Sequence, residues 1–522
     1  FAGRYRSLAR WYFVLPALVV TAGVVVPVVY LIVRAFQADA SILAGLVLRS
    51  RNLRLLLNTF LLGAGVLALG TAIAFPLAWF TTRTRIRGGR LLTLLGVMPL
   101  AIPGYVMAYV LLATTGSYGT LAHLFGIVVP RLGGYDGALI ALTLATFPYL
   151  LLNLRMGLVG LDTSLEETAR SLGYGPRDIV LRVILPQLRP AYYSGALLVG
   201  LHVLGDFGVV SLMRFETFSY ALYLQYSASY DRIYAAWLAL MLLALTGAVL
   251  LLEARLLRGL FLHRAGAGVR RQSRLPDSRG RKIGVYLFSG IVGTISVGIP
   301  TLTVGYWMTR ATSNPWADLW PALWDSVAAS APAALAAAAL ALPLAYLGVR
   351  RPSLLTRGLE RLAYFGYATP PLAFALALIF FSLQAAPWFY QTMGLLITAY
   401  AIHFLAEAVG PIRSALYHAP PSIQEAARSL GRSPLRAFFE ATFPLLKRGI
   451  LVSIAFVFLS AMKELPITFL LSPIGFETLA LNAWGYTSEA LFGSAAPFAL
   501  AIMIFSALFV GLLLVKDTVP VE

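Results

Sequence analysis

Four ionisable side chains lie within long apolar runs of this chain, where a charge is costly and usually has a function. Asp206 is in the run HVLGDFGVVSL, and Glu464 is in SAMKELPITFLL, 258 residues further along the chain. Lys463 precedes Glu464, and Glu407 lies in a separate apolar run. These residues predict a substrate pathway, or a gate that uses Lys463 as the counter-charge. The alternative is a structural pair that anchors broken helices, because glycines flank Asp206 and a proline follows shortly after Glu464.

A second set of polar residues recurs in two copies of one segment. Residues 164–186, SLEETARSLGYGPRDIVLRVILP, align without gaps to residues 422–444, SIQEAARSLGRSPLRAFFEATFP, and the offset is again 258. A serine three residues before a glutamate opens each copy and predicts a helix start with a capping box. The glycine six residues after that glutamate is placed to end the helix in the left-handed conformation. The residues concerned are Ser164, Glu167 and Gly173 in the first copy and Ser422, Glu425 and Gly431 in the second.

Each copy continues with a proline placed to begin a second short helix. The prolines and their caps are Pro176 with Gly175 and Pro434 with Ser433. Pro186 and Pro444 are expected to close the unit before the next membrane span. The glutamates taken singly could be capping residues and nothing more. Two copies of the whole pattern at matching depth favour a docking element for a pair of identical partners.

The segments between these polar residues are apolar enough to cross a membrane. The chain has 522 residues, of which 59% are hydrophobic and 12% charged, and its mean hydropathy is +0.79. A soluble domain carries roughly twice that charge, whereas about 20 apolar residues in a helix span a bilayer. We therefore expect an all-α polytopic membrane protein. About twelve spans are predicted, at 11–33, 54–80, 91–113, 137–158, 190–213, 234–257, 285–308, 326–348, 361–385, 393–415, 448–471 and 494–515.

Membrane topology, rather than nucleic-acid binding, explains the net charge of +19. Arginine and lysine are concentrated in alternate connections between the spans, as expected for cytoplasmic loops. This bias predicts that both termini are cytoplasmic. The Arg-rich segment 258–283 is predicted to be a flexible linker close to the anionic inner leaflet, and a regulatory site is the alternative. There is no cysteine, which excludes disulfides and thiolate metal sites.

The two copies divide the chain into halves of six predicted spans each. An even number of spans gives both halves the same orientation in the membrane, so the repeats are parallel and substrate is expected to pass between them. PLAW at 76–79 returns as PLAY at 343–346, and this offset of 267 reflects a longer outside loop in the first half. The predicted domains are 1–257 with the loop 164–186, the linker 258–283, and 284–522 with the loop 422–444.

The heptapeptides ETARSLG (167–173) and EAARSLG (425–431) resemble the EAA coupling motif of bacterial binding-protein-dependent ABC importers. That motif is Glu-Ala-Ala, three residues and Gly, followed by a hydrophobic stretch that ends in Pro, and Thr168 is the one departure from its core. The resemblance covers essentially the whole chain and implies the type I ABC importer transmembrane fold, with each short helix docked in a groove of an ATPase subunit. Carried over residue by residue, it implies that the coupling residues are Glu167, Ala169, Arg170, Gly173, Glu425, Ala427, Arg428 and Gly431.

The chain itself is not expected to be an enzyme. No G-x-x-x-x-G-K-[ST] phosphate loop occurs in it, so ATP and Mg are expected on the partner ATPase subunits and no cofactor is expected here. The resemblance implies an assembly of this chain, two copies of an ABC ATPase subunit and one periplasmic substrate-binding protein. The expected location is the lipid bilayer of the bacterial inner membrane, and no nucleic-acid partner is expected.

The substrate is indicated by resemblance alone. GDFGVVSLMRFETFSYALY and MKELPITFLLSPIGFETLA are similar to the ferric-iron branch of the family, in which the two halves are commonly fused. Fe(III) is a hard cation that prefers oxygen ligands, so the absence of cysteine is no obstacle. Importers of thiamine, phosphonate or polyamine are the alternatives within the family. An ion-coupled secondary transporter that uses Asp206 and Glu464 as proton or cation sites is the alternative from another class, and a channel ranks last.

Overall fold

The computed structural model describes most of the chain, and every regular element among the described residues is a helix. The described residues are 2–37, 45, 49–84, 86–161, 163–227, 231–257, 279–311, 315–350 and 352–516. Of the predicted linker 258–283, residues 258–278 lie outside these ranges, and helix α14 (Arg279–Gly293) begins at Arg279.

Seven helical stretches among the described residues are long and apolar enough to cross a membrane. They are Ser50–Arg83 (α3), Gly134–Val159 (α7), Arg232–Leu257 (α13), Arg279–Met308 (α14 to α15), Trp316–Arg350 (in α16, Pro315–Arg350), Pro434–Met462 (α22 to α23) and Phe492–Gly511 (in α26, Phe492–Lys516). Two further helices occupy predicted spans without belonging to this set: α1 (Ala2–Ala35) and α10 (Leu185–Gly205).

Three more spans are formed if each pair of sharply bent helices counts as one, which gives up to ten. The pairs are Gly89–Ala101 (α4 and η1) with Gly104–Thr114 (α5), Leu354–Ala368 (α17) with Pro371–Ala385 (α18), and Met393–His403 (α19) with Leu405–His418 (α20). The chain is therefore a multi-pass helical membrane protein. The count of twelve spans stays a prediction.

Two of these bends occur at prolines that the repeat makes equivalent. Pro103 separates η1 from α5 with a bend of 94°, and Pro370 separates α17 from α18 with a bend of 106°. Ile102 and Thr369 have extended backbones, because the ring of a following proline disfavours the helical conformation. The same local sequence rule therefore breaks one span in each half.

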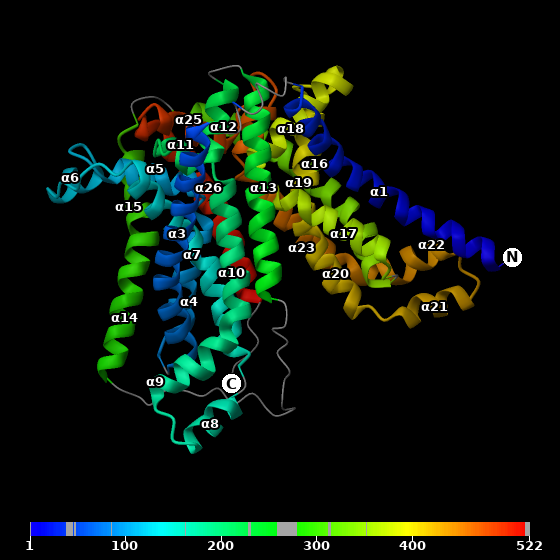
Figure 1. The fold of residues 1–522 in the computed structure, drawn as a ribbon, viewed down its shortest axis with the longest axis horizontal. Coiled ribbons are helices and arrows are strands. Elements are labelled where there is room, and N and C mark those ends of the chain that lie inside the picture. The colour runs from blue at the N-terminus through cyan, green and yellow to red at the C-terminus, as the bar shows by residue number, and fades with distance from the viewer. Residues whose placement is uncertain are drawn as a thin grey trace. The chain divides into compact units, whose positions relative to one another are not determined.

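The helices pack into two compact units, each assembled from both sequence halves. Unit 1 contains Phe1–Leu48, Leu222–Leu243 and Pro315–Asn482, and unit 2 contains Arg49–Ala221, Ala244–Asn314 and Ala483–Glu522. In unit 1, α1 packs against α16, α17 and α18 (Figure 1). In unit 2, α15 (Ile299–Met308) packs against α5 and α26. Each half thus contributes its first helix to the unit built mainly from the other half.

Equivalent helices form the centre of each unit: α3, α7 and α10 in unit 2, and α16, α20 and α23 (Phe443–Met462) in unit 1. Small residues allow these helices to approach closely. A Cβ atom on Gly157 would lie 2.7 Å from Cβ of Ala191, and one on Gly449 would lie 2.7 Å from Cβ of Ala415. The two pairs are equivalent, with glycine and alanine exchanged. This packing positions α10 and α23, the two helices that follow the repeated segments.

Candidate functional site

Each copy of the repeated segment begins with a nine-residue helix, α8 (Thr163–Ser171) in unit 2 and α21 (Pro421–Ser429) in unit 1. Gly173 and Gly431 follow these helices, and both have a φ of +84°. The predicted left-handed glycine turns are therefore confirmed. Open space surrounds the position of a Cβ at both glycines, so the backbone conformation alone selects the residue.

The two turns also have the same hydrogen bonds. In the first copy the N–H of Gly173 donates to the carbonyl of Arg170, and the N–H of Tyr174 donates to the carbonyl of Ala169, both at 3.0 Å. In the second copy the bonds run from Gly431 to Arg428 at 3.0 Å and from Arg432 to Ala427 at 3.1 Å. This pair of bonds is the Schellman motif, which satisfies carbonyls that a helix end would otherwise leave unpaired.

The predicted capping boxes are wrong. Helix α8 begins at Thr163, so Ser164 is its second residue rather than its cap. Helix α21 begins at Pro421, so Ser422 is likewise its second residue, and no side chain caps the helix from Pro420. Proline favours the first position of a helix, where its missing N–H has no partner to lose. This preference places the start of α21 one residue before the serine.

The second short helix begins as predicted. α9 (Pro176–Asp178) and α22 (Pro434–Ala437) both have proline at the first position, preceded by Gly175 and Ser433. The Ser433 hydroxyl oxygen accepts a hydrogen bond from the N–H of Arg436 at 3.4 Å. Both caps are therefore confirmed in position, and the second one also in its side-chain contact.

Pro186 and Pro444 do not close the unit, contrary to the prediction. The π-helical turns η2 (Ile179–Ile184) and η5 (Phe438–Thr442) lead from the short helices into α10 and α23 without a break. The N–H before each proline donates to the carbonyl five residues back, from Leu185 to Val180 and from Phe443 to Phe438. A proline ring clashes with the carbonyl four residues back in an α-helix, and the wider turn accommodates it. Each segment is thus continuous with a membrane helix.

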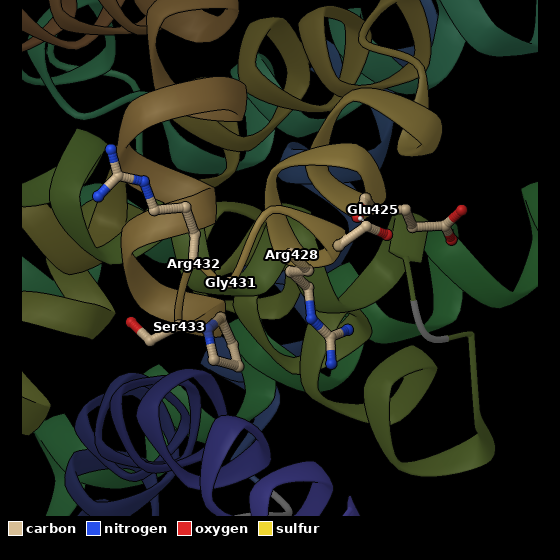
Figure 2. Close-up of a pocket in the computed structure, with 7 residues that line it drawn as sticks. Glu425, Arg428, Gly431, Arg432 and Ser433 are labelled. Carbon is tan, nitrogen blue, oxygen red and sulfur yellow. Dashed lines mark hydrogen bonds between the residues drawn. The ribbon is translucent and has the colours of Figure 1, made fainter.

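Most residues of the predicted coupling set are exposed to solvent. Those exposed are Glu167, Arg170, Gly173, Glu425, Arg428 and Gly431, whereas Ala169 is buried and Ala427 is half-buried. In the second copy, Glu425, Arg428, Gly431, Arg432 and Ser433 line a hollow beside the glycine turn (Figure 2). The charged side chains therefore project from the unit, and the alanine side of the helix packs on it.

Sequence reasoning missed two leucines in these segments. Leu172 and Leu430 immediately precede the glycines, and their side chains are 72% and 84% exposed. An apolar residue beside the terminal glycine of an otherwise polar helix is a signal that could have found them. An exposed leucine thus recurs at the same position at the end of both helices.

Two of the four intramembrane residues accept hydrogen bonds from backbone N–H groups at the start of short helices. An Asp206 carboxylate oxygen accepts the N–H groups of Val209 (2.9 Å) and Val210 (3.2 Å), at the start of α11 (Gly208–Leu212). A Glu464 carboxylate oxygen accepts the N–H of Ile467 (2.9 Å), at the start of α24 (Pro466–Leu471). Both acids therefore make the contacts of helix anchors. Their role in a pathway or gate stays a prediction.

The other two residues interact with each other in unit 1. Glu407 accepts a hydrogen bond from the hydroxyl of Ser460 at 2.7 Å and interacts electrostatically with Lys463. The fold thus brings Glu407, Lys463 and Glu464 together, whereas Asp206 belongs to unit 2. Among the described residues, no group of three or more histidine, aspartate and glutamate side chains is placed to hold a metal ion.

A contact at the equivalent depth in unit 2 has different chemistry. The Tyr149 hydroxyl and Nε2 of His202 are 3.1 Å apart, and these positions match Glu407 and Ser460 at the offset of 258. Comparing the two halves position by position could have found this pair, which sequence reasoning missed. The repeat conserves a contact between two membrane helices here but not the charge.

One family model matches two separate segments of the chain. The family model "Binding-protein-dependent transport system inner membrane component" matches residues 67–261 and again residues 333–516. The Fe(3+)-transport system permease protein FbpB 2 of Haemophilus influenzae is 33% identical over 496 residues, which cover 93% of this chain and 94% of that protein.

Other relatives match a smaller part of the chain. A probable molybdenum ABC transporter permease of Haloferax volcanii is 31% identical over 196 residues, or 37% of this chain and 71% of that protein. The molybdenum transport system permease ModB of Escherichia coli K12 is 32% identical over 135 residues, or 25% of this chain and 58% of that protein. The double family match and the near full-length relative lead to one conclusion: this chain belongs to the family of binding-protein-dependent transport system inner membrane components, with two family segments fused in one polypeptide.

Proposed function

We propose that this chain is the membrane-spanning subunit of an importer that is powered by separate ABC ATPase subunits. The observation that carries the proposal is the pair of exposed segments with identical Schellman turns, each continuous with a membrane helix. A helix that continues through a π-turn keeps its backbone hydrogen bonds. A displacement of α9 or α22 is therefore passed directly to α10 or α23. Helices α8 and α21 pack on the π-turns and act on the membrane helices through this contact.

In this proposal the exposed face of each segment is the contact for the ATPase. The coupling residues are Glu167, Ala169, Arg170, Gly173, Glu425, Ala427, Arg428 and Gly431. The exposed members touch the partner, and the two alanines hold the helix against its own unit. Thr168 is the departure from the motif. Its hydroxyl donates a hydrogen bond to the carbonyl of Ser164 within α8 at 2.8 Å. Its hydroxyl donor therefore has a partner within the helix and does not need one on the ATPase.

The assembly follows from the two segments. We infer one ATPase subunit for each segment, with ATP and Mg bound on those subunits, and one periplasmic binding protein that delivers the substrate. The inferred location is the bacterial inner membrane with both termini in the cytoplasm, on the side that carries the ATPases. The support is the charge distribution of the loops together with the membership of a binding-protein-dependent family.

Ferric iron is the substrate that we propose. The near full-length relative carries Fe(3+) in its name, and the shorter molybdenum relatives cover only part of this chain. The test is metal analysis of the binding protein that stimulates ATP hydrolysis by the reconstituted complex. We expect stoichiometric Fe(III). A binding protein that carries molybdate, thiamine, phosphonate or polyamine instead would contradict the iron assignment and leave the importer assignment standing.

Removing the two exposed leucines is expected to weaken ATPase docking. Burying one leucine contributes about 1.5–3 kcal/mol, and each 1.4 kcal/mol corresponds to a factor of about ten in Kd. The double variant Leu172→Ser/Leu430→Ser should therefore bind the ATPase at least about tenfold more weakly, as measured by titrating the ATPase onto the chain in nanodiscs.

Leu354→Ser is the matched control for this measurement. Leu354 is 87% exposed at the start of α17, outside both segments. It should bind the ATPase as the unaltered chain does. An equal loss in the control, or no loss in the double variant, would show that the leucines are not part of the docking face.

A further inference from the structure

A buried ion pair connects the first repeated segment to a membrane helix. Nη2 of Arg83, the last residue of α3, lies 2.7 Å from Oε1 of Glu166 in α8. The two side chains are only 5% and 3% exposed. The Arg83 guanidinium also lies over the ring of Trp79, 5.8 Å from its centre. Helix α8 is thus connected to α3 by an ion pair that is almost fully buried.

The second segment is held at the same place by hydrogen bonds. Gln424 is the counterpart of Glu166, and its side-chain oxygen accepts hydrogen bonds from the hydroxyls of Tyr346 (3.2 Å) and Thr442 (3.4 Å). Arg350, the last residue of α16 and the counterpart of Arg83, donates to the backbone carbonyl of Ala419. Among the described residues, helix α21 is therefore held at this place by hydrogen bonds, and no ion pair is found there.

Three positions differ together between the two copies. The first half has Trp79, Glu166 and Ile184 where the second has Tyr346, Gln424 and Thr442. The first half thus lacks both hydroxyls that donate hydrogen bonds to Gln424. It also has a carboxylate in place of the Gln424 amide. An arginine is present in both. The change replaces a contact between opposite charges by hydrogen bonds to a neutral amide, so the two segments are held by different chemistry.

A buried ion pair and a neutral hydrogen-bond set respond differently to movement. Separating the two charges leaves each of them buried without a counter-charge, which costs more free energy than separating neutral groups that share a hydrogen bond. Helix α8 should therefore move together with the end of α3. Helix α21 retains more freedom relative to the end of α16.

We propose that Arg83 and Glu166 are positioning residues that pass the movement of the first coupling helix to α3, so that the two halves are coupled to their ATPases by unlike contacts. The proposal rests on the proposed function, because it requires α8 to receive an ATPase subunit. It assigns no role in substrate binding to either residue.

The test uses a variant that removes both charges together. Arg83→Met/Glu166→Leu replaces the pair by apolar side chains of similar length, an exchange that often leaves stability unchanged or improved. The whole complex is reconstituted in proteoliposomes with Fe(III)-loaded binding protein, and Fe(III) uptake is measured per ATP hydrolysed. ATPase co-purification and the melting temperature of the chain are measured in parallel.

We expect the double variant to retain the ATPase and its melting temperature while uptake per ATP falls about tenfold, the size of a typical coupling effect. Tyr346→Phe is the matched control in the second half, where Thr442 remains as a donor, and should change the ratio less than about twofold. An unchanged ratio in the double variant, or an equal fall in the control, would overturn the proposal alone. Failure of the unaltered chain to retain any ATPase would overturn the proposed function as well.

Discussion

Replacing both Gly173 and Gly431 with valine is expected to abolish ATP-driven uptake while leaving the membrane helices assembled. Both glycines have a φ of +84°, which costs an L-residue roughly 1–2 kcal/mol, and more if it is β-branched. No neighbouring atom blocks a side chain at either position, so the effect comes from the backbone turn and not from a clash. Uptake by reconstituted complexes and ATPase stimulation by the loaded binding protein are the measurements.

Two companion variants make this result specific. Gly173→Asn/Gly431→Asn should retain most of the uptake, because asparagine adopts the left-handed conformation more readily than other residues with a side chain. Gly290→Val places the same side chain at an exposed helical glycine with open space around it and should leave coupling intact. If the valine double variant docks the ATPase and transports normally, the assignment of these turns to coupling is wrong.

Removing the carboxylate of Asp206 is expected to lower uptake strongly, whereas neutralising it is not. The Asp206 side chain accepts two backbone N–H groups at the start of α11. Leaving a buried donor unpaired costs about 1–3 kcal/mol, so Asp206→Ala should reduce uptake by at least about tenfold. Asp206→Asn keeps a carbonyl acceptor and should retain most of the uptake. The same contrast applies at Glu464, which accepts the N–H of Ile467.

The variant that decides between an anchor and a pathway carries both neutral replacements. Asp206→Asn/Glu464→Gln removes the two charges and preserves both acceptors. Near-normal uptake in reconstituted complexes supports the anchoring role that their hydrogen bonds indicate. A loss as large as that of Asp206→Ala would instead show that the charges themselves are required, as expected for a pathway or gate.

The turns of the repeated segments were predictable because their causes are local. A glycine with positive φ and a proline at the first position of a helix are properties of one or two residues, and Gly173 and Pro176 show both. The capping box failed where two local rules competed, since Pro421 begins α21 before Ser422 can cap it. The anchoring bond of Asp206 is also local, because an acid three residues before a helical N–H is a common cap.

Features that depend on tertiary packing were not predictable in this way. Pro186 was expected to interrupt the chain, but packing of α10 against α3 and α7 keeps the helix intact and a π-turn absorbs the proline. Each unit contains the first helix of the other sequence half. A sequence repeat cannot predict this, because it shows which segments are related and not which segments are in contact. The pair of Arg83 and Glu166 joins residues far apart in the chain, and only the fold brings them together.

The importer assignment is tested most directly by substrate uptake into proteoliposomes that contain the purified chain with its ATPase subunits. We expect uptake only when ATP, the ATPase subunits and the loaded binding protein are all present, with no effect of an imposed proton or sodium gradient. Gradient-driven uptake by the chain alone, without ATP or ATPase, would contradict it and establish an ion-coupled secondary transporter instead.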